Sequence, residues 1–332
     1  MSAVPGPTPA GRAALTLVRY DEGHRQLWDA FIPHSNQGTL FHTRAFLAYH
    51  PAGRFVDASL LFFKHNELCA VLPAALDPHT GRNVLRSHPG ASFGGPATAA
   101  ALGVQECDRL VTLLLEHCRR QGYAGVEITL PPPVYFSHPN NHLDYVLWRH
   151  GFRYRKREVT SIIPADPPAG LLPREFHRAV RRAQRRGVTI QESDDFPAFH
   201  AHLRNHMLAR HHVEPTHSLA DLQCLRRLLP GQLRLFTACL GAEMIAGTLL
   251  FLCNPRAALA FYYLSHREGF RQYHGFELLM FEVLRWCRAQ GLRALDFGTF
   301  TLNSEPNWGL ANFKESFGAQ GIFRDTLYLE LG

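Results

Sequence analysis

One pattern of hydrophobic and polar positions occurs twice along this chain of 332 residues. The segment LVTLLLEHCRRQGYAGVEITL (residues 110–130) has apolar residues at helical spacing, then a glycine, then a short apolar strand. The segment LMFEVLRWCRAQGLRALDFGT (residues 279–299) has the same pattern 169 positions later, so that Glu127 aligns with Asp296. We therefore predict a helix–glycine–strand unit in each half of the chain.

Other segments support a duplication. RHGFRYRKREVTSII (residues 149–163) and SFGAQGIFRDTLYLEL (residues 316–331) each lead from a glycine turn into an alternating strand. Each half also has a predicted hairpin before its helix, at residues 57–76 and 232–253, and residues 258–266 predict a further strand. Strands and helices mixed in this way indicate an α+β protein, in which each domain is a mixed, mostly antiparallel sheet flanked by helices.

A proline-rich segment predicts the boundary between the two domains. IIPADPPAGLLP (residues 162–173) contains four prolines, which is typical of a linker. We expect a disordered lead-in at residues 1–14, a first domain at 15–165 and a second domain at 166–332. The last strand can belong to either domain.

Composition narrows the partners and the compartment. The formal net charge is +7, mostly from arginine, which suits phosphates, RNA or an anionic membrane surface without selecting among them. Seven scattered cysteines without a close pair indicate a reduced, cytoplasmic protein. No apolar run approaches the roughly 18 residues of a membrane-spanning helix. The motifs of serine hydrolases, P-loop NTPases and dinucleotide-binding oxidoreductases do not occur.

A basic helix is predicted at the start of the second domain. In EFHRAVRRAQRRG (residues 175–187), helical spacing places Arg178, Arg181, Arg182 and Arg185 on one face. Such a strip suits bidentate contacts to the phosphates of tRNA or of a nucleotide-linked ligand. The alternative is a solvated helix face, which is the usual fate of a charge run.

The segment GLANFKESFGAQ (residues 309–320) raises a candidate for catalysis, because Lys314 stands between Phe313 and Phe317. A cation held in an apolar environment stabilises an oxyanion strongly. The alternative is a lysine whose stem lies on the rings while its ammonium stays in water.

Histidines are frequent between residues 199 and 218. His202 and His206 are four positions apart, as in helical zinc sites. However, no glutamate follows the first histidine and no third ligand is marked, so we predict no metal.

Several of these segments together resemble a known family. The strand AFYYLSH, the loop REGFRQYHG, the helix FELLMFEVLRWCRAQ and the strand RALDFGT (residues 260–299) resemble the central unit of the GNAT acyltransferase fold. Two such units, the basic helix and the ending NWGLANFKESFGAQ resemble the tandem-GNAT, Fem-type (FemABX-like) acyl- and aminoacyl-transferases. The resemblance covers most of the chain and is strongest from Arg174 onward.

The resemblance implies an activity and its partners. It implies a cytoplasmic N-acyltransferase in which an amine attacks an activated acyl group, without a covalent enzyme intermediate or a metal. The donor is acyl-CoA or aminoacyl-tRNA. The acceptor is a small molecule, a peptide, a sugar or a cell-envelope precursor, and the oligomeric state is open. The rival hypothesis is a catalytically inactive scaffold that binds an anionic glycan or RNA.

The resemblance also implies site residues. The Phe-Lys pair of the family falls on Phe313 and Lys314, and a pattern around PTHS suggests His217, or else His212, as the base that accepts the amine's proton. Asp296 is a second candidate base. The residues expected at the acceptor cleft are Arg210, Tyr262, Tyr263 and Asn307.

The donor remains open between the two classes. Coenzyme-A-dependent GNAT enzymes bind the diphosphate at a helix N-terminus, through Gln/Arg-x-x-Gly-x-Gly/Ala. Here QYHGFE keeps Gln272 and Gly275, but Glu277 replaces the last small residue, while Arg271 and His274 are present to compensate. The altered loop favours aminoacyl-tRNA, and the retained residues favour acyl-CoA.

Overall fold

The computed structural model describes residues 15–332, so the disordered lead-in predicted for residues 1–14 lies outside the described residues. The first half contains β1 (Leu15–Arg19), α1 (Arg25–Phe31), α2 (Arg44–Leu47), β2 (Val56–Asp57), β3 (Leu60–Lys64), β4 (Glu67–Leu72), β5 (Ala74–Leu76), β6 (Val84–Ser87), β7 (Ala97–Thr98), α3 (Val104–Arg120), β8 (Gly125–Thr129), α4 (His142–Arg149) and β9 (Arg153–Pro164).

The second half begins with the predicted basic helix. Its elements are α5 (Arg174–Arg185), β10 (Val188–Ser193), α6 (Phe196–His211), α7 (Leu219–Leu228), β11 (Leu233–Leu240), β12 (Glu243–Asn254), β13 (Ala257–Leu264), α8 (Gly275–Ala289), β14 (Ala294–Thr299), β15 (Thr301–Leu302), β16 (Glu305–Pro306), α9 (Trp308–Glu315) and β17 (Gln320–Glu330). The predicted hairpins are β3–β4 and β11–β12. Within residues 15–332, no helix combines the length and the apolar character needed to cross a membrane.

The same unit occurs in each half. β6 and β8 pair in parallel over three residues, with α3 between them in the chain, and β13 and β14 do the same around α8. All other strand pairs among the described residues are antiparallel. Gly151 after α4 and Gly318 after α9 both have a positive φ, which glycine adopts readily. Each turn leads into a long strand, as the sequence predicts.

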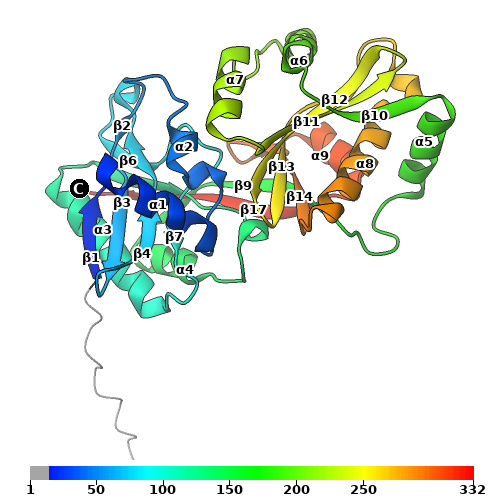
Figure 1. Cartoon of the computed structure of the whole chain (residues 1–332). Helices are drawn as coiled ribbons and strands as arrows, with labels where there is room; N and C mark the ends of the chain where they lie inside the picture. The colour runs from blue at the N-terminus through cyan, green and yellow to red at the C-terminus, as the bar shows by residue number, and fades with distance from the viewer. Residues whose placement is uncertain (1–14) are drawn as a thin grey trace, which may run out of the picture.

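The two halves share one sheet of 11 strands, in the order β10-β11-β12-β13-β14-β9-β17-β8-β6-β5-β2. β17 pairs with β9 on one side and with β8 on the other, and β9 pairs also with β14. In Figure 1, β17 runs from the second half back among the elements of the first, where the C-terminus lies. A four-stranded sheet, β1-β3-β4-β7, belongs to the first half. The α+β class with mostly antiparallel sheets is as predicted.

Three large clusters of buried side chains stabilise this arrangement. The first core packs α3 and α4 against β8 and the end of β17. The second core packs α5 and α8 against β11 to β14. The third core combines α6 and α7 of the second half with Phe41, Phe46 and Tyr135 of the first half. The two halves are therefore joined by a shared core as well as by a shared sheet.

We predict that Gly125→Ala destabilises the fold, because Gly125 lies where β8 meets β17. A Cβ atom at this position would lie 2.9 Å from the carbonyl oxygen of Leu329 and 2.7 Å from the hydroxyl of Tyr328. Relieving such overlap requires backbone movement, and the expected loss in the free energy of unfolding is roughly 1–3 kcal/mol. Urea unfolding followed by circular dichroism measures it.

Gly309→Ala is the matched control. A Cβ atom on Gly309, in the first turn of α9, would approach only the Asn307 side chain, at 3.5 Å. Alanine favours a helix, so the free energy of unfolding should be unchanged or slightly higher. Equal stability of the Gly125 variant and wild type would contradict the tight approach of β8 and β17.

Candidate active site

The parallel strands β13 and β14 separate after a short ladder, and helix α9 lies between their ends. The strands have eight and six residues, but only three of each pair with the other strand. The ring of Phe313 on α9 lies 5.9 Å from the rings of Tyr263 on β13 and of Phe297 on β14. This packing brings Phe313 and the following residue, Lys314, to the place where the two strands separate.

Lys314 is buried, with 2% of its surface exposed. Its Nζ atom donates hydrogen bonds to the carbonyl oxygens of Gly298, at 2.6 Å, and Thr299, at 2.8 Å. It also lies 5.5 Å from the ring centroid of Phe297. An ammonium has three N–H donors, so one of them has no hydrogen-bond partner among the residues the structure describes.

Phe313 and Phe317 do not enclose the ammonium as the sequence suggests. Their rings pack edge to face against each other at 5.1 Å and extend the second core. Neighbouring positions on an α-helix point about 100° apart, so Lys314 leaves α9 in a different direction from Phe313. Backbone carbonyls of β14, rather than two aromatic rings, hold the ammonium.

Burial governs the protonation of this site. It lowers the pKa of Lys314 from 10.5 to about 7, while the negative charge of Asp296 opposes the shift. Burial also raises the pKa of Asp296, whereas hydrogen bonds from Thr160, Gly298 and Tyr135 to its carboxylate act in the opposite direction. Near neutral pH, Lys314 therefore changes its charge readily.

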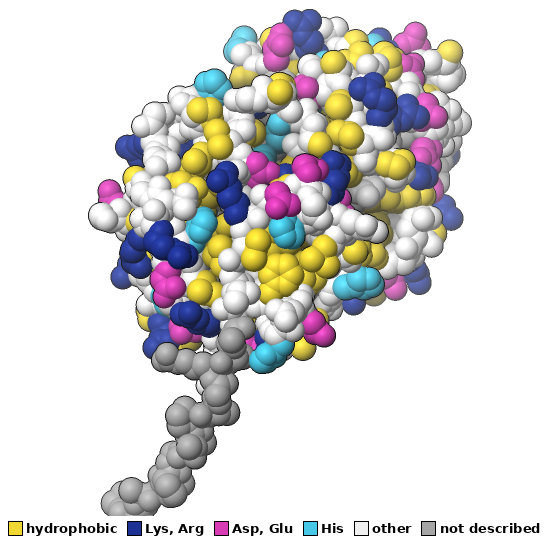
Figure 2. Space-filling model, turned by 60° about the vertical axis from the view of Figure 1, so that its left-hand side comes forward, with side chains coloured by type: hydrophobic (Ala, Val, Ile, Leu, Met, Phe, Trp, Pro, Cys, Tyr) yellow, Lys and Arg dark blue, Asp and Glu magenta, His cyan; other side chains and the backbone are white. Residues whose placement is uncertain are grey.

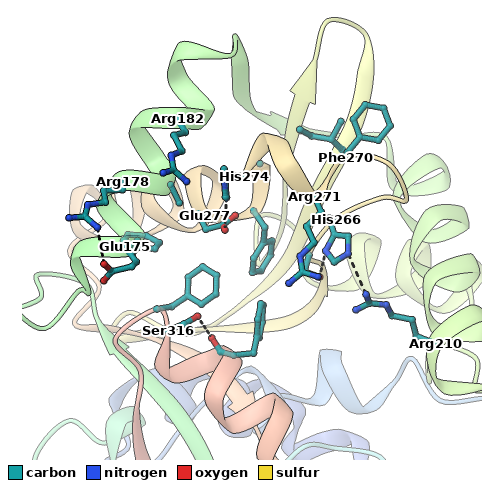
Figure 3. A pocket seen from close by; sticks show the side chains of 18 residues that line it. Glu175, Arg178, Arg182, Arg210, His266, Phe270, Arg271, His274, Glu277 and Ser316 are labelled. Carbon is teal, nitrogen blue, oxygen red and sulfur yellow. Dashed lines mark hydrogen bonds and ion pairs between the residues drawn. The ribbon is translucent and has the colours of Figure 1, made fainter.

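A cavity of about 510 Å³ lies against α9 and is lined by arginines (Figure 3). Arg178 and Arg182 of α5 stand on one side, and Arg210 of α6 and Arg271 stand on the other. Arg178 is paired with Glu175 of its own helix at 3.1 Å. Four guanidinium groups around one cavity favour an anionic ligand.

Aromatic rings and a helix end form other parts of the cavity wall. Phe276, Phe313 and Phe317 contribute the rings, and α8 begins at the cavity with Gly275. The N-terminus of an α-helix attracts anions through its free N–H groups and its dipole. Lys314 does not line the cavity, but Phe313, its neighbour on α9, does.

Glu277, which the sequence flags as unfavourable for a diphosphate, is partly shielded. Its Oε1 atom lies 3.1 Å from Nδ1 of His274, and both side chains line the cavity. The imidazole of His274 contacts one oxygen of the Glu277 carboxylate at the helix end. The carboxylate of Glu277 is therefore partly shielded by His274 from an anion bound at this loop.

The predicted phosphate-binding residues divide into two groups. Arg178, Arg182, Arg271, His274 and Gly275 line the cavity, as described. Arg181, Arg185 and Gln272 do not, and Gln272 donates to a backbone carbonyl of its own turn. Helical geometry splits the predicted arginine strip, because only its Arg178 and Arg182 row faces α8 and the cavity.

Gly275 has a packing role that the sequence does not reveal. A Cβ atom on Gly275 would lie 2.7 Å from Cδ1 of Ile245 on β12. The glycine therefore allows α8 to approach the sheet closely. A larger residue at this position would disturb the second core as well as any bound anion.

His217, the predicted base, lies away from this cavity. It is buried in the third core, with Nε2 3.1 Å from the hydroxyl of Tyr49 and Nδ1 3.0 Å from the hydroxyl of Tyr262. Burial lowers its pKa to about 4. Because both ring nitrogens have partners, the geometry of His217 is that of a neutral link between the two halves.

The four residues predicted for an acceptor cleft occupy separate places. Arg210 lines the cavity, and Tyr263 stacks on Phe313. Tyr262 points to the other face of β13, into the third core. Asn307 caps α9 by accepting a hydrogen bond from a backbone N–H of the first turn, at 3.0 Å.

Neither a metal site nor a second compact basic patch stands out in the views and residues described. No group of three or more His, Cys, Asp or Glu side chains is placed to hold a metal ion within residues 15–332. Figure 2 shows a face that brings the first half forward, with its Lys and Arg side chains in several separate places among hydrophobic ones. The gathering of arginines around the cavity of Figure 3 is more compact.

The structure adds residues that sequence reasoning missed. Ser265, His266 and Phe270 line the cavity, and Nε2 of His266 lies 3.5 Å from the guanidinium of Arg210. Ser265 and His266 end the strand predicted at residues 258–266, and Phe270 lies in the loop after it, so the end of that strand was the available signal. Tyr135 of the first half reaches Asp296, and no spacing rule connects the two.

Comparison with known proteins agrees with the fold. The profile of the acetyltransferase (GNAT) domain matches residues 173–315. The structure of FemX superposes with a TM-score of 0.71 at 13% identity, over 95% of this chain and 97% of FemX. L-PGS from Bacillus licheniformis superposes with a TM-score of 0.57 at 13% identity, over 92% of this chain and 91% of its own.

A third solved structure has a similar fold. The C-terminal domain of a putative lysylphosphatidylglycerol synthetase from Agrobacterium fabrum superposes with a TM-score of 0.57 at 11% identity, over 92% of this chain and 91% of that domain. No curated protein matches the sequence. The comparisons agree with the predicted resemblance: residues 173–315 are similar to the GNAT acetyltransferase domain, and the fold of the chain is similar to that of FemX.

We predict that Lys314→Met stabilises the protein at pH 6. A lysine whose pKa is lower in the folded state destabilises the fold while it is charged, and this penalty declines as pH rises from about 7 toward 10.5. Replacing the buried charge by an apolar side chain of similar length should add roughly 1–4 kcal/mol to the free energy of unfolding. The gain should shrink at pH 9, and urea unfolding at both pH values measures it.

Lys156→Met is the control, because Lys156 lies on β9 outside this cluster and is only partly buried. Its substitution should change stability little, and equally at both pH values. A Lys314 variant that is less stable than wild type at pH 6 and pH 9 would show that the ammonium contributes net stability to the fold.

Proposed function

We propose that this chain, which has a GNAT acetyltransferase domain within a Fem-type tandem-GNAT fold, is an N-acyltransferase. In this proposal it moves an activated acyl group, acetyl or aminoacyl, from a phosphate-bearing donor to an amino group. The acceptor is a small molecule or peptide, a sugar or a cell-envelope precursor. One structural relative is named as a putative lysylphosphatidylglycerol synthetase, which is compatible with an acceptor from the cell envelope.

One observation carries the proposal. The desolvated ammonium of Lys314 has one N–H without a hydrogen-bond partner among residues 15–332, and Lys314 lies next in the chain to Phe313, an aromatic residue of the cationic cavity. Holding a charged side chain in this position is unfavourable for folding, since burial lowers its pKa to about 7. Such strongly shifted groups beside a cavity are typical of functional sites.

The chemistry follows from these groups. The amine nitrogen attacks the acyl carbonyl carbon, and the electron pair of the carbonyl bond moves to oxygen. The free N–H of Lys314 stabilises the resulting oxyanion, and the low dielectric of its surroundings strengthens the interaction. When the carbonyl reforms, the bond to the leaving group breaks, and the thiolate of coenzyme A or the ribose oxygen of tRNA departs.

The cationic cavity serves the donor in this proposal. Acyl-CoA and aminoacyl-tRNA both carry phosphates, so a cationic cavity suits either donor. Arg178, Arg182 and Arg271 would bind those phosphates together with the N-terminus of α8. The negative charge of Glu277 disfavours a diphosphate directly at the helix end. The contact of His274 with Glu277 reduces this effect.

His217 has no part in the proposed chemistry. Its two ring nitrogens are taken up by tyrosine hydroxyls in the third core. We propose instead that the amine loses its proton to solvent or to the departing group as the leaving bond breaks. The rings of Tyr263 and Phe313 stack on each other, and Phe313 lines the cavity.

Lys314→Met should reduce turnover by about a hundredfold, if the ammonium stabilises the oxyanion. Acetyl transfer from acetyl-CoA to a panel of primary amines, followed by the release of free thiol, measures it. For charged tRNA the assay is the loss of the aminoacyl group in the presence of the same amines. Circular dichroism establishes that the variant is folded.

Lys156→Met should retain wild-type turnover in the same assays. Unchanged turnover in the Lys314 variant, with a donor that wild type uses, would remove Lys314 from the mechanism. Absence of turnover with every donor and amine would favour the inactive scaffold.

The arginines of α5 supply a matched pair of double variants for donor binding. Arg178→Glu with Arg182→Glu changes the row that lines the cavity, and Arg181→Glu with Arg185→Glu changes the row that does not. Both pairs change the net charge equally. The first pair should weaken binding of acetyl-CoA or charged tRNA by tenfold or more at low salt, and the second pair much less.

Calorimetric titration with acetyl-CoA and filter retention of charged tRNA measure these affinities, and the difference between the pairs should shrink as salt rises. Micromolar binding of acetyl-CoA by wild type identifies the donor class as acyl-CoA, whereas retention of tRNA without it identifies aminoacyl-tRNA. Equal losses in both double variants would assign the arginines to general surface charge.

A further inference from the structure

Asp296 lies at the centre of a buried hydrogen-bond network close to Lys314. Its Oδ2 atom accepts a hydrogen bond from the hydroxyl of Tyr135, at 2.8 Å, and its Oδ1 atom accepts from the hydroxyl of Thr160 and from the N–H of Gly298, at 2.8 Å. Asp296 is 2% exposed. Such a carboxylate, with three donors, is well satisfied despite its burial.

The network comes from distant parts of the chain. Tyr135 belongs to a short 3-10 helix of the first half, at Pro133–Tyr135, and Thr160 lies on the shared strand β9. Leu295 and Phe297, on either side of Asp296 in β14, point into the second core. Asp296 therefore points to the opposite face of the sheet, where Tyr135 packs in the third core.

The network connects to Lys314 through one glycine. Gly298, whose N–H is held by Asp296, has a φ of +76° and presents its carbonyl oxygen to the ammonium of Lys314 at 2.6 Å. A Cβ atom on Gly298 would lie 3.6 Å from Nζ of Lys314. Asp296 thus fixes the turn that orients one of the two carbonyl acceptors of Lys314.

The charges around this pair are few. Asp296 and Arg324 of β17 are the charged groups that act on Lys314, and Arg324 is itself paired with Glu158 of β9. Tyr135, Arg324 and the thiol of Cys253 on β12 are the other titratable groups near Asp296. Asp296 is therefore the negative charge that favours the protonated form of Lys314.

From this geometry we infer that Asp296 is a positioning residue: its carboxylate holds the N–H of Gly298, whose carbonyl oxygen orients the Lys314 ammonium. Tyr135 and Thr160 hold the Asp296 carboxylate, so that the first half contributes to a site in the second. The catalytic part of this inference rests on the proposed function of Lys314. The effect of Asp296 on Lys314 can be tested without measuring turnover.

The chain is unusually suited to a direct test. It contains three lysines, Lys64, Lys156 and Lys314. Labelling with lysine enriched in ¹³C at the ε-carbon should give three resonances in the folded protein, and Lys314→Met identifies the one from the site. Following the chemical shift of that resonance against pH gives the pKa of Lys314 in the full chain.

Asp296→Asn should lower the pKa of Lys314 by about one unit or more, since the attractive charge is lost. Asp166→Asn is the matched control, because Asp166 is an exposed carboxylate of the second half that pairs with Arg288. That variant should leave the Lys314 titration unchanged. An unchanged Lys314 pKa in folded Asp296→Asn would overturn the inference.

A second measurement applies even if Asp296→Asn does not fold. In wild type, the Lys314 resonance should show a smaller second inflection at acidic pH, where the neighbouring Asp296 takes up its proton. Tyr135→Phe should move this inflection to higher pH by roughly one unit, because the ionised carboxylate loses a hydrogen bond. A single inflection, or one that Tyr135→Phe does not move, would show that Asp296 and Tyr135 do not act on Lys314.

The outcomes separate the inference from the proposed function. If Lys314→Met keeps full turnover while Asp296→Asn shifts the pKa of Lys314, the network exists but serves no catalysis. If Lys314→Met loses turnover while Asp296→Asn leaves the pKa of Lys314 unchanged, Lys314 acts without this positioning residue.

Discussion

The antiparallel ladder between β9 and β17 is the constraint on which the rest of the structure depends. It joins the strands of the first half to those of the second in one sheet, and β14 pairs with the other edge of β9. Thr160 on β9 then faces Asp296 on β14, and Arg324 on β17 comes near Lys314. Without this ladder, β9 and β17 would each present an open sheet edge.

The buried cation of the site belongs to one of the few lysines of the chain. Of the 35 basic residues, three are lysines, and the rest are arginines that mostly remain at the surface in ion pairs or around the cavity. Arginine keeps its charge under almost all conditions, whereas lysine loses its charge when it is buried. A lysine at position 314 therefore provides a group whose charge the surrounding protein can adjust, which an arginine would not.

Local features of the sequence predicted much of the fold. The repeated helix–glycine–strand pattern appears as α3–β8 and α8–β14, the hairpins appear as β3–β4 and β11–β12, and the basic helix is α5. These elements are encoded by neighbours in the chain, through periodicity and turn residues. The cationic cavity was partly predictable for the same reason, since Arg178, Arg271 and Gly275 lie on elements with clear signals.

The parts that could not be predicted depend on long-range packing. The hydrogen bond between Tyr135 and Asp296 joins residues 161 positions apart, and nothing in either segment specifies the other. The surroundings of Lys314 and the location of His217 in the third core follow from how helices and sheets are oriented. The repeat aligns Glu127 with Asp296, yet Glu127 pairs with Arg155 whereas Asp296 accepts hydrogen bonds from neutral donors.

The position of β17 between β8 and β9 has a consequence for the order of events during synthesis. Thr129 on β8 and its partner Thr326 on β17 are 197 residues apart, so β8 waits for its neighbour while most of the second half is made. At roughly 5–20 residues per second, the wait is on the order of ten to forty seconds. During that time an inner strand of the finished sheet is an open edge, able to pair with other chains. This open edge is therefore an aggregation risk of the growing chain that the finished fold no longer displays.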